Sequence, residues 1–143
     1  MAIDWTDDPA DIDWNELSAL YRAAPLGDKP PAHLKRAFAG SMFRIFAFDG
    51  GTLVGVGRAL ADGCDCAYLC DIAVLPTHQG LGLGKDIVAK LLLLCEGHRK
   101  IILYAAPGKE PFYKRFGFRR MKTAMAIFPN PETAAARGYL EGE

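Results

Sequence analysis

The sequence predicts a mixed α/β protein in which helices flank a central sheet, and three observations lead to this class. Two short segments with apolar residues at helical spacing come first. Two apolar segments typical of strands follow, joined by the turn Asp49-Gly50-Gly51. A strand, a glycine-rich turn and an amphipathic helix then occupy residues 69–95. Because 143 residues are enough for one hydrophobic core, we expect residues 1–143 to form a single domain.

The first forty residues predict a short strand and two helices. Residues 2–5 suit a strand, and Asp11 or Asp13 can cap the helix that follows. A loop rich in proline (25–31) ends this helix. We expect a second helix over residues 31–39.

The middle of the chain predicts three strands. Residues 43–48 and 53–60 flank the hairpin turn, and residues 67–74 follow the turn Asp62-Gly63. Gly55 and Gly57 lie within the second strand. Since glycine weakens a strand, we expect a bulge or the close approach of a ligand there.

The C-terminal part of the chain predicts short alternating elements. Residues 100–105 form a buried, apolar strand pattern, and residues 111–116 suit a short helix. Residues 118–121 and 123–128 are expected to continue as an interrupted or bulged strand. Residues 132–140 have the composition of a frayed helix.

Composition excludes several classes of protein. Net charge is zero, with 17 basic and 17 acidic residues, so electrostatics favour neither nucleic acid nor an anionic membrane as a partner. No apolar run approaches the roughly 20 residues that cross a bilayer, and the acidic N-terminus does not look like a signal peptide. The four cysteines lack zinc-site spacing. We therefore expect free thiols, no metal, no membrane or nucleic-acid partner, and a cytoplasmic protein.

The glycine-rich turn at 79–84 is the strongest functional signal. Glycines let the backbone approach a ligand closely, and a helix start offers free N–H groups that suit a phosphate or pyrophosphate. The glycine spacing is too tight for a dinucleotide fingerprint, and Asp86 stands where a Walker loop requires Ser or Thr. The pattern that fits is Gln-x-x-Gly-x-Gly, formed by Gln79, Gly82 and Gly84.

A second motif, Phe112-Tyr113-Lys114-Arg115-Phe116-Gly117-Phe118, lies some thirty residues later. In this order and spacing the two motifs resemble those of the GCN5-related N-acetyltransferases (GNAT), and the resemblance runs from about residue 43 to 128. It looks closest to small acetyltransferases of the glucosamine-6-phosphate and arylalkylamine (serotonin) type. The resemblance implies a GNAT-type fold, with a mixed, mostly antiparallel central sheet and splayed parallel strands at 67–74 and 100–105.

The resemblance also implies acetyl-CoA as the cofactor. Backbone N–H groups of the glycine turn would hold its pyrophosphate, and the splayed strand would pair with its pantetheine arm. A backbone N–H of Ala73 or Val74 would bind the developing oxyanion. The implied cofactor-binding residues are Ile72, Ala73, Val74, Gln79, Gly80, Leu81, Gly82, Leu83, Gly84, Lys85, Phe112 and Tyr113.

Two side chains are the expected catalytic residues. Tyr113 matches the family's Phe-Tyr motif and is the expected general acid, since transfer from a phenol of pKa ~10 to a thiolate of conjugate-acid pKa ~8.5 is uphill by only about 2 kcal/mol. Asp71 matches an aspartate of the glucosamine-phosphate type. A carboxylate of pKa ~4 is about 8 kcal/mol short of deprotonating an ammonium of pKa ~10, so we expect it to orient the amine or a relay water. Tyr68 stands where other branches carry a glutamate base, which leaves the base open.

The activity implied is transfer of the acetyl group from acetyl-CoA to the primary amine of a small molecule, by direct attack in a ternary complex. No cysteine is placed to carry an acyl group, and Cys70 is expected to pack in the core. Two alternatives are transfer to a protein lysine or N-terminal amine, and a non-catalytic acyl-CoA-binding module with a regulatory role. The presence of Tyr113 favours catalysis over the latter. The resemblance also implies a homodimer.

Overall fold

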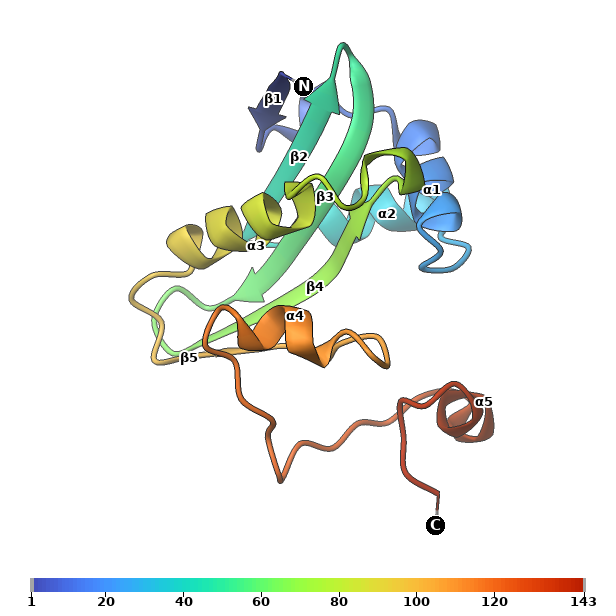
Figure 1. Ribbon diagram of the computed structural model, residues 1–143, viewed down its shortest axis with the longest axis vertical. Coiled ribbons are helices and arrows are strands. Elements are labelled where there is room, and N and C mark those ends of the chain that lie inside the picture. The colour runs from blue at the N-terminus through green and yellow to red at the C-terminus, as the bar shows by residue number, and fades with distance from the viewer. Residues whose placement is uncertain (1, 143) are drawn as a thin grey trace. The chain divides into compact units, whose positions relative to one another are not determined.

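A computed structural model describes residues 2–142, which form two compact units (Figure 1). The first unit ends at Leu103 and the second begins at Tyr104. The first unit contains a five-stranded sheet made of β1 (Ile3–Thr6), β2 (Phe43–Asp49), β3 (Thr52–Ala61), β4 (Cys66–Val74) and β5 (Lys100–Ile102).

The strands lie in the order in which they occur in the chain, β1-β2-β3-β4-β5. The pairs β1–β2, β2–β3 and β3–β4 are antiparallel, and β4 and β5 are parallel. The predicted mixed, mostly antiparallel sheet is therefore confirmed. A crossover through a helix joins β4 to β5, as a parallel pair requires.

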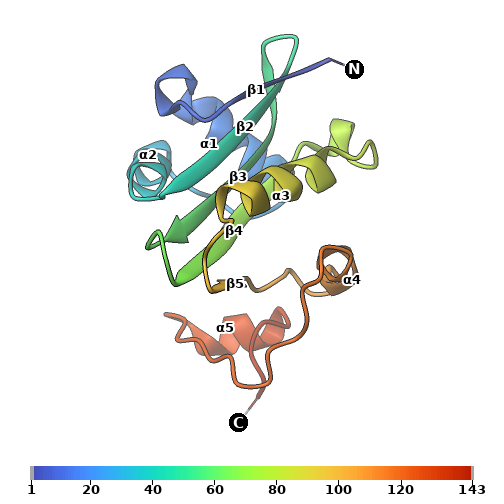
Figure 2. The same ribbon diagram turned by 90° about the vertical axis from the view of Figure 1, so that its left-hand side faces the viewer.

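Three helices cover the sheet of the first unit. Figure 2 shows α1 (Trp14–Ala23) and α2 (Pro31–Ala39) on one face and α3 (Leu83–Leu94) on the other. Asp13 caps α1 by accepting hydrogen bonds from the amides of Asn15 and Glu16 at 2.9 and 3.4 Å. The main hydrophobic core lies under α1 and α2, where Tyr21 and Phe38 are completely buried.

Gly55 and Gly57 make room for α3. Both residues face this helix, and a Cβ atom built on either would lie only 2.8 Å from a methyl group, of Ile87 or Leu91 respectively. The glycines therefore let α3 lie close against β3. The predicted bulge in β3 is present, because its register with β2 shifts beside Gly55, and β4 has a second bulge opposite Gly57. The element that closely approaches both glycines is α3.

Replacing Gly57 with alanine should lower the free energy of unfolding by about 1–3 kcal/mol, because the new methyl group would overpack Ile87 and Leu91. Gly40→Ala is the matched control, since an added Cβ there would lie at an ordinary 3.6 Å from its nearest neighbour. Chemical denaturation of both variants measures the difference. Equal stability would contradict the close packing of α3 on β3.

The second unit is built from two short helices and irregular segments. These helices are α4 (Glu110–Lys114) and α5 (Pro131–Ala136). Asn130 caps α5 by accepting a hydrogen bond from the amide of Thr133 at 3.1 Å. The rings of Tyr104, Phe128 and Tyr139 contact one another with centroid distances of 5.8–6.3 Å.

Three predictions for the C-terminal part of the chain were wrong or too long. Residues 118–128 form no strand, because a strand needs a hydrogen-bonded neighbour and none of residues 2–142 pairs with this segment. The strand expected over 100–105 ends at Ile102, where its pairing with β4 ends. The helix expected over 132–140 ends at Ala136.

None of the helices within residues 2–142 has both the length and the apolar composition needed to cross a membrane.

Candidate active site

A β-bulge in β4 lies at the centre of the first unit's candidate site. The register between β3 and β4 shifts by one residue, so that Asp71 and Ile72 together face Gly57. Asp71 has a φ of 57° and is the only non-glycine residue with a positive φ in the described chain. This left-handed conformation costs a non-glycine residue roughly 1 kcal/mol or more, although aspartate tolerates it better than most. Neighbouring groups must therefore stabilise the bulge.

Three side chains hold Asp71 in place. Arg58 donates from Nε and Nη2 to Oδ2 of Asp71 at 2.9 and 2.8 Å, and Nζ of Lys29 lies 3.5 Å from Oδ1. The buried Tyr21 hydroxyl donates to the backbone carbonyl of Asp71 at 2.7 Å. Burial, aided by the charge of Asp71, raises the pKa of Tyr21 well above its ordinary value, so the hydroxyl keeps its proton. Asp71 thus connects the bulge to β3, to α1 and to the loop that precedes α2.

The ion pairs of Asp71 were missed in the sequence. Arg58 is the only charged residue of β3, in a strand that is otherwise apolar apart from Thr52. A lone arginine in such a strand needs an anionic partner, and this was the available signal. Because Arg58 and Lys29 neutralise the carboxylate, Asp71 has the contacts of a residue that positions other groups.

The edge of β4 beyond the bulge is open. Pairing with β5 extends only from Cys66 to Tyr68, and no strand of the described chain pairs with residues 69–74 on that edge. The predicted splaying of the two parallel strands is therefore present. Ile72, Ala73 and Val74 lie on this open stretch, where a ligand with amide groups could bind as an added strand does.

The glycine turn leads from β4 to an uncapped helix start. Gly80 and Gly82 have φ values of 79° and 84°, which only glycine adopts readily, and space is open where their side chains would be. Gly82 is the N-cap of α3 and supplies no side-chain acceptor to the first N–H groups of the helix. Free amides, open space and the positive end of a helix fit the pyrophosphate of acetyl-CoA.

Two side-chain hydrogen bonds fix this turn. Nε2 of Gln79 donates to the carbonyl of Val74 at 3.0 Å, so the glutamine of the motif stabilises the turn by a hydrogen bond to the end of β4. Nε2 of His78 lies 2.8 Å from Oδ2 of Asp49 in the β2–β3 hairpin. This contact joins the turn to the end of β2.

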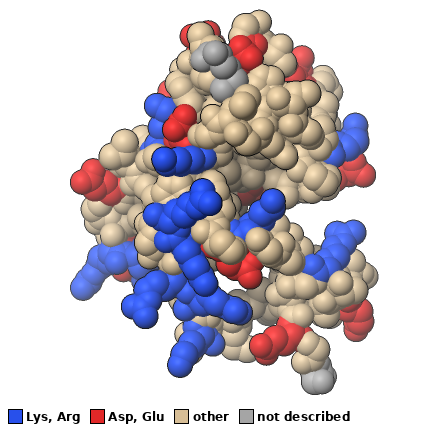
Figure 3. Space-filling model, in the orientation of Figure 1, with Lys and Arg blue, Asp and Glu red and all other residues tan. Residues whose placement is uncertain are grey.

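The basic side chains on this face of the molecule gather mainly over α4 and the segment that follows it, in the second unit (Figure 3). The start of α3 carries one basic side chain, Lys85. Lys85, in the first turn of α3, is exposed. It was predicted to bind the cofactor and lies where it could add charge to the helix start.

Phe112 and Tyr113 belong to the second unit, whereas Asp71 and the other predicted site residues belong to the first. In α4, the ring of Tyr113 contacts the rings of Phe112 and Phe118 at centroid distances of 5.0 and 6.1 Å. Burial raises the pKa of Tyr113 above its ordinary value of 10.0, so its hydroxyl remains protonated at neutral pH. A protonated, half-buried phenol can act as a proton donor.

Cys70 precedes Asp71 on β4 and is a free thiol. Burial raises its pKa to about 11, with Arg58 opposing and Asp71 adding to the shift. At neutral pH almost no thiolate forms, and only the thiolate is nucleophilic. Cys70 is half-buried, which is less than the core packing expected for it.

The fold and the site together define an α/β protein with a glycine-rich turn and an uncapped helix start beside a bulged strand. The sequence matches the acetyltransferase (GNAT) domain family over residues 23–126. The chain therefore belongs to the GNAT acetyltransferase family.

Three relatives illustrate this membership. An uncharacterised ycf52-like N-acetyltransferase of Prochlorococcus marinus is 28% identical over 113 residues, which cover 75% of this chain and 63% of that protein. Chloroplastic serotonin N-acetyltransferase 2 of Oryza sativa subsp. japonica is 40% identical over 70 residues, or 48% of this chain and 35% of that protein. Glucosamine 6-phosphate N-acetyltransferase of Trypanosoma brucei brucei is 30% identical over 122 residues, covering 78% and 83%. The chain thus spans less than two thirds of the first two relatives.

Solved structures share the fold. A probable acetyltransferase of Staphylococcus aureus superposes with a TM-score of 0.80 at 22% identity, covering 90% of this chain and 99% of that one. A predicted acetyltransferase of Clostridium acetobutylicum, solved with acetyl-CoA, superposes with a TM-score of 0.67 at 16% identity, covering 89% and 96%.

Replacing Gly84 with valine should weaken acetyl-CoA binding at least about tenfold, since one lost charged hydrogen bond is worth roughly 1.5–3 kcal/mol. Gly84 is a better probe than Gly82, whose φ of 84° would add strain to any substitution. The matched control is Ala89→Val, on the exposed side of the same helix. Calorimetric titration measures both affinities. An unchanged affinity in folded Gly84→Val protein would refute the assignment of the glycine turn as the pyrophosphate site.

Proposed function

We propose that this chain transfers the acetyl group of acetyl-CoA to the primary amine of a small molecule, by direct attack in a ternary complex. The observation that carries the proposal is the continuity of the bulge, the open edge of β4 and the uncapped start of α3 along residues 71–85. Membership of the GNAT family supports it. So do relatives named for acetylating glucosamine 6-phosphate and serotonin, both small amines.

The first unit would hold the acetyl donor through its backbone. Amides at the start of α3 would bind the pyrophosphate, and the open edge at Ile72–Val74 would pair with the amides of the pantetheine arm. Acetyl-CoA supplies an activated thioester. A backbone N–H of Ala73 or Val74 would donate to the oxyanion, and removal of one such donor commonly costs about 3–4 kcal/mol.

Asp71 would act as a positioning residue. Its carboxylate is bound by Arg58 and Lys29, and its carbonyl is bound by Tyr21. These contacts fix the bulge and the loop before α2 in relation to each other. A carboxylate that already has two cationic partners is a poor acceptor for the amine proton, so we propose that the amine loses its proton to water.

Tyr113 would donate the proton to the departing thiolate. Its raised pKa keeps the donor form present well above neutral pH. Phe112 would support it through the ring contact within α4.

Asp71→Asn tests orientation against base chemistry. Asparagine tolerates the left-handed conformation and keeps the side-chain shape, so the variant isolates the loss of charge. We expect a modest loss of rate that is similar at pH 7 and at pH 9, because the amine, of pKa ~10, loses its proton to water in both proteins. The control is Asp65→Asn, which breaks a surface ion pair with Lys100. A loss of rate that is large at pH 7 and largely recovered by pH 9 would show that Asp71 accepts the proton.

Tyr113→Phe removes the proton and keeps the ring. We expect kcat to fall by roughly 10- to 1,000-fold with little change in cofactor affinity. In the parent protein, activity should be lost only as pH rises through the raised pKa of Tyr113, hence above pH 10, and this limb should vanish in the variant. Tyr139→Phe, in the same unit, is the control. A kcat within twofold of the parent when chemistry limits turnover would refute the role.

A panel of amines decides between this proposal and its alternatives. Thiol release with small primary amines supports it, whereas release only with lysine peptides or N-terminal peptides would favour a protein acceptor. Binding of acetyl-CoA without turnover of any amine would indicate a regulatory binding module. We also propose a homodimer, which sedimentation velocity can test.

A further inference from the structure

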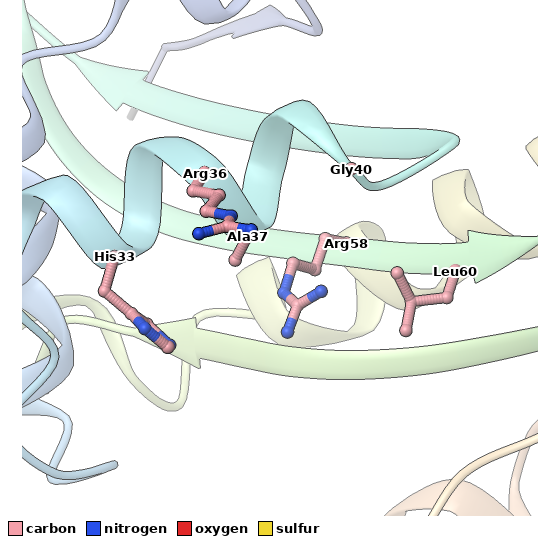
Figure 4. A pocket seen from close by; sticks show the side chains of 6 residues that line it. All are labelled: His33, Arg36, Ala37, Gly40, Arg58 and Leu60. Carbon is pink, nitrogen blue, oxygen red and sulfur yellow. The ribbon is translucent and has the colours of Figure 1, made fainter.

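A pocket of about 350 Å³ lies on the first unit between α2 and β3, beside the bulge. Its volume falls near the lower end of the roughly 300–1,000 Å³ of small-ligand pockets. Figure 4 shows His33 and Arg58 pointing to the same side, with Arg36 on the helix between them. The lining residues are His33, Arg36, Ala37, Gly40, Arg58 and Leu60.

The charge of this pocket is positive. None of the six lining residues is acidic. From residue 29 to residue 61 the only acidic residue is Asp49, which is engaged by His78 away from the pocket. The basic residues of that stretch, apart from His33, are Lys29, Lys35, Arg36, Arg44 and Arg58.

The nearest carboxylate does not cancel this charge. Asp71 is shared by Arg58 and Lys29, so two cations face one anion. Arg44 is the cross-strand neighbour of Arg58, and its Nε is buried with no hydrogen-bond partner among the described residues. Half-buried charges of one sign repel one another and have lost part of their hydration, which is energetically unfavourable. An anion that binds beside them would lower this electrostatic free energy.

Arg36 is the group best placed to bind such an anion. The other arginines are occupied, since Nη1 of Arg58 donates to Ser41 at 3.2 Å and Nη1 of Arg44 donates to backbone carbonyls of Ser41 and Phe38 at 2.9 and 3.4 Å. The guanidinium of Arg36 has no hydrogen-bond or ion-pair partner within residues 2–142, and its five N–H donors match carboxylate or phosphate oxygens.

We infer that the amine acceptor carries an anionic oxyacid group, a phosphate or a carboxylate, which binds in this pocket to Arg36 and His33. This inference rests on the proposed function, because it places the anion beside the bulge at which the amine would react. Arg58 supplies charge to the pocket while it holds Asp71. The pocket therefore selects amines that bear a negative group over neutral or purely cationic amines.

Two matched acceptor pairs test the inference: glucosamine 6-phosphate against glucosamine, and tyrosine against tyrosinamide. In at least one pair the anionic member should have a kcat/KM at least about tenfold higher, the worth of a charge-assisted hydrogen bond. A preference in the first pair identifies phosphate, and one in the second identifies carboxylate. Equal or higher kcat/KM for both neutral members overturns the inference.

Arg36→Ala assigns the preference to the pocket. It should lower kcat/KM for the anionic acceptor by about 10- to 100-fold, mostly through KM, and leave the neutral acceptor within twofold. Lys35→Ala is the control, an exposed cation on the same helix that does not line the pocket. An equal loss for both acceptors, or an equal effect of the two variants, contradicts the role of Arg36.

Calorimetry with non-acetylated CoA present separates this inference from the proposed function. Binding of either anionic acceptor that Arg36→Ala weakens about tenfold or more supports the pocket even when no amine is acetylated. Absence of Arg36-dependent binding overturns the inference even when neutral amines are acetylated rapidly.

Discussion

The bulge at Asp71 is the constraint on which the first unit depends. It holds a non-glycine residue in a left-handed conformation, and that conformation persists because Arg58, Lys29 and Tyr21 bind both ends of the residue. The bulge lies in the part of β4 that has no strand partner on the β5 side, since that pairing ends at Tyr68. Backbone strain and an ion pair therefore occur together, next to the edge at which a ligand is proposed to bind.

The proposed cofactor side and the proposed acceptor side lie on opposite faces of the sheet and are positioned by different means. On one face, Gly55 and Gly57 allow α3 to approach β3, which sets where the helix start lies. On the other, the contacts of Asp71 with Lys29 and Tyr21 set the position of α1 and of the loop before α2. The two sides meet only through β3 and β4, so the geometry of these two strands determines how donor and acceptor would be presented to each other.

Local patterns predicted most of the first unit. Hydrophobic periodicity and turn residues located β2, β3, β4 and the three helices, and the two motifs correctly indicated the GNAT family. The binding role predicted for the turn at 79–84 stays a prediction. The bulge was suggested by glycine in β3, but its occupant, Asp71, could not be identified because a left-handed φ leaves no periodic trace. The partners Arg58 and Lys29 were missed because an ion pair between distant positions is set by strand register. The strand predicted over residues 118–128 is absent for a related reason. Strand propensity alone does not supply a neighbouring strand with which to pair.

The hydrogen bond from Tyr21 to Asp71 spans 50 positions of the chain. Contacts so distant in sequence form late, since the entropy of closing a long loop is lost before the contact can stabilise anything. The turn at 79–85 depends on closer contacts in the chain, since α3 is held on β3 by Gly55 against Ile87 and Gly57 against Leu91, pairs 32 and 34 positions apart. During synthesis and refolding, the ability to hold an acyl donor should therefore arise before the ability to orient an acceptor.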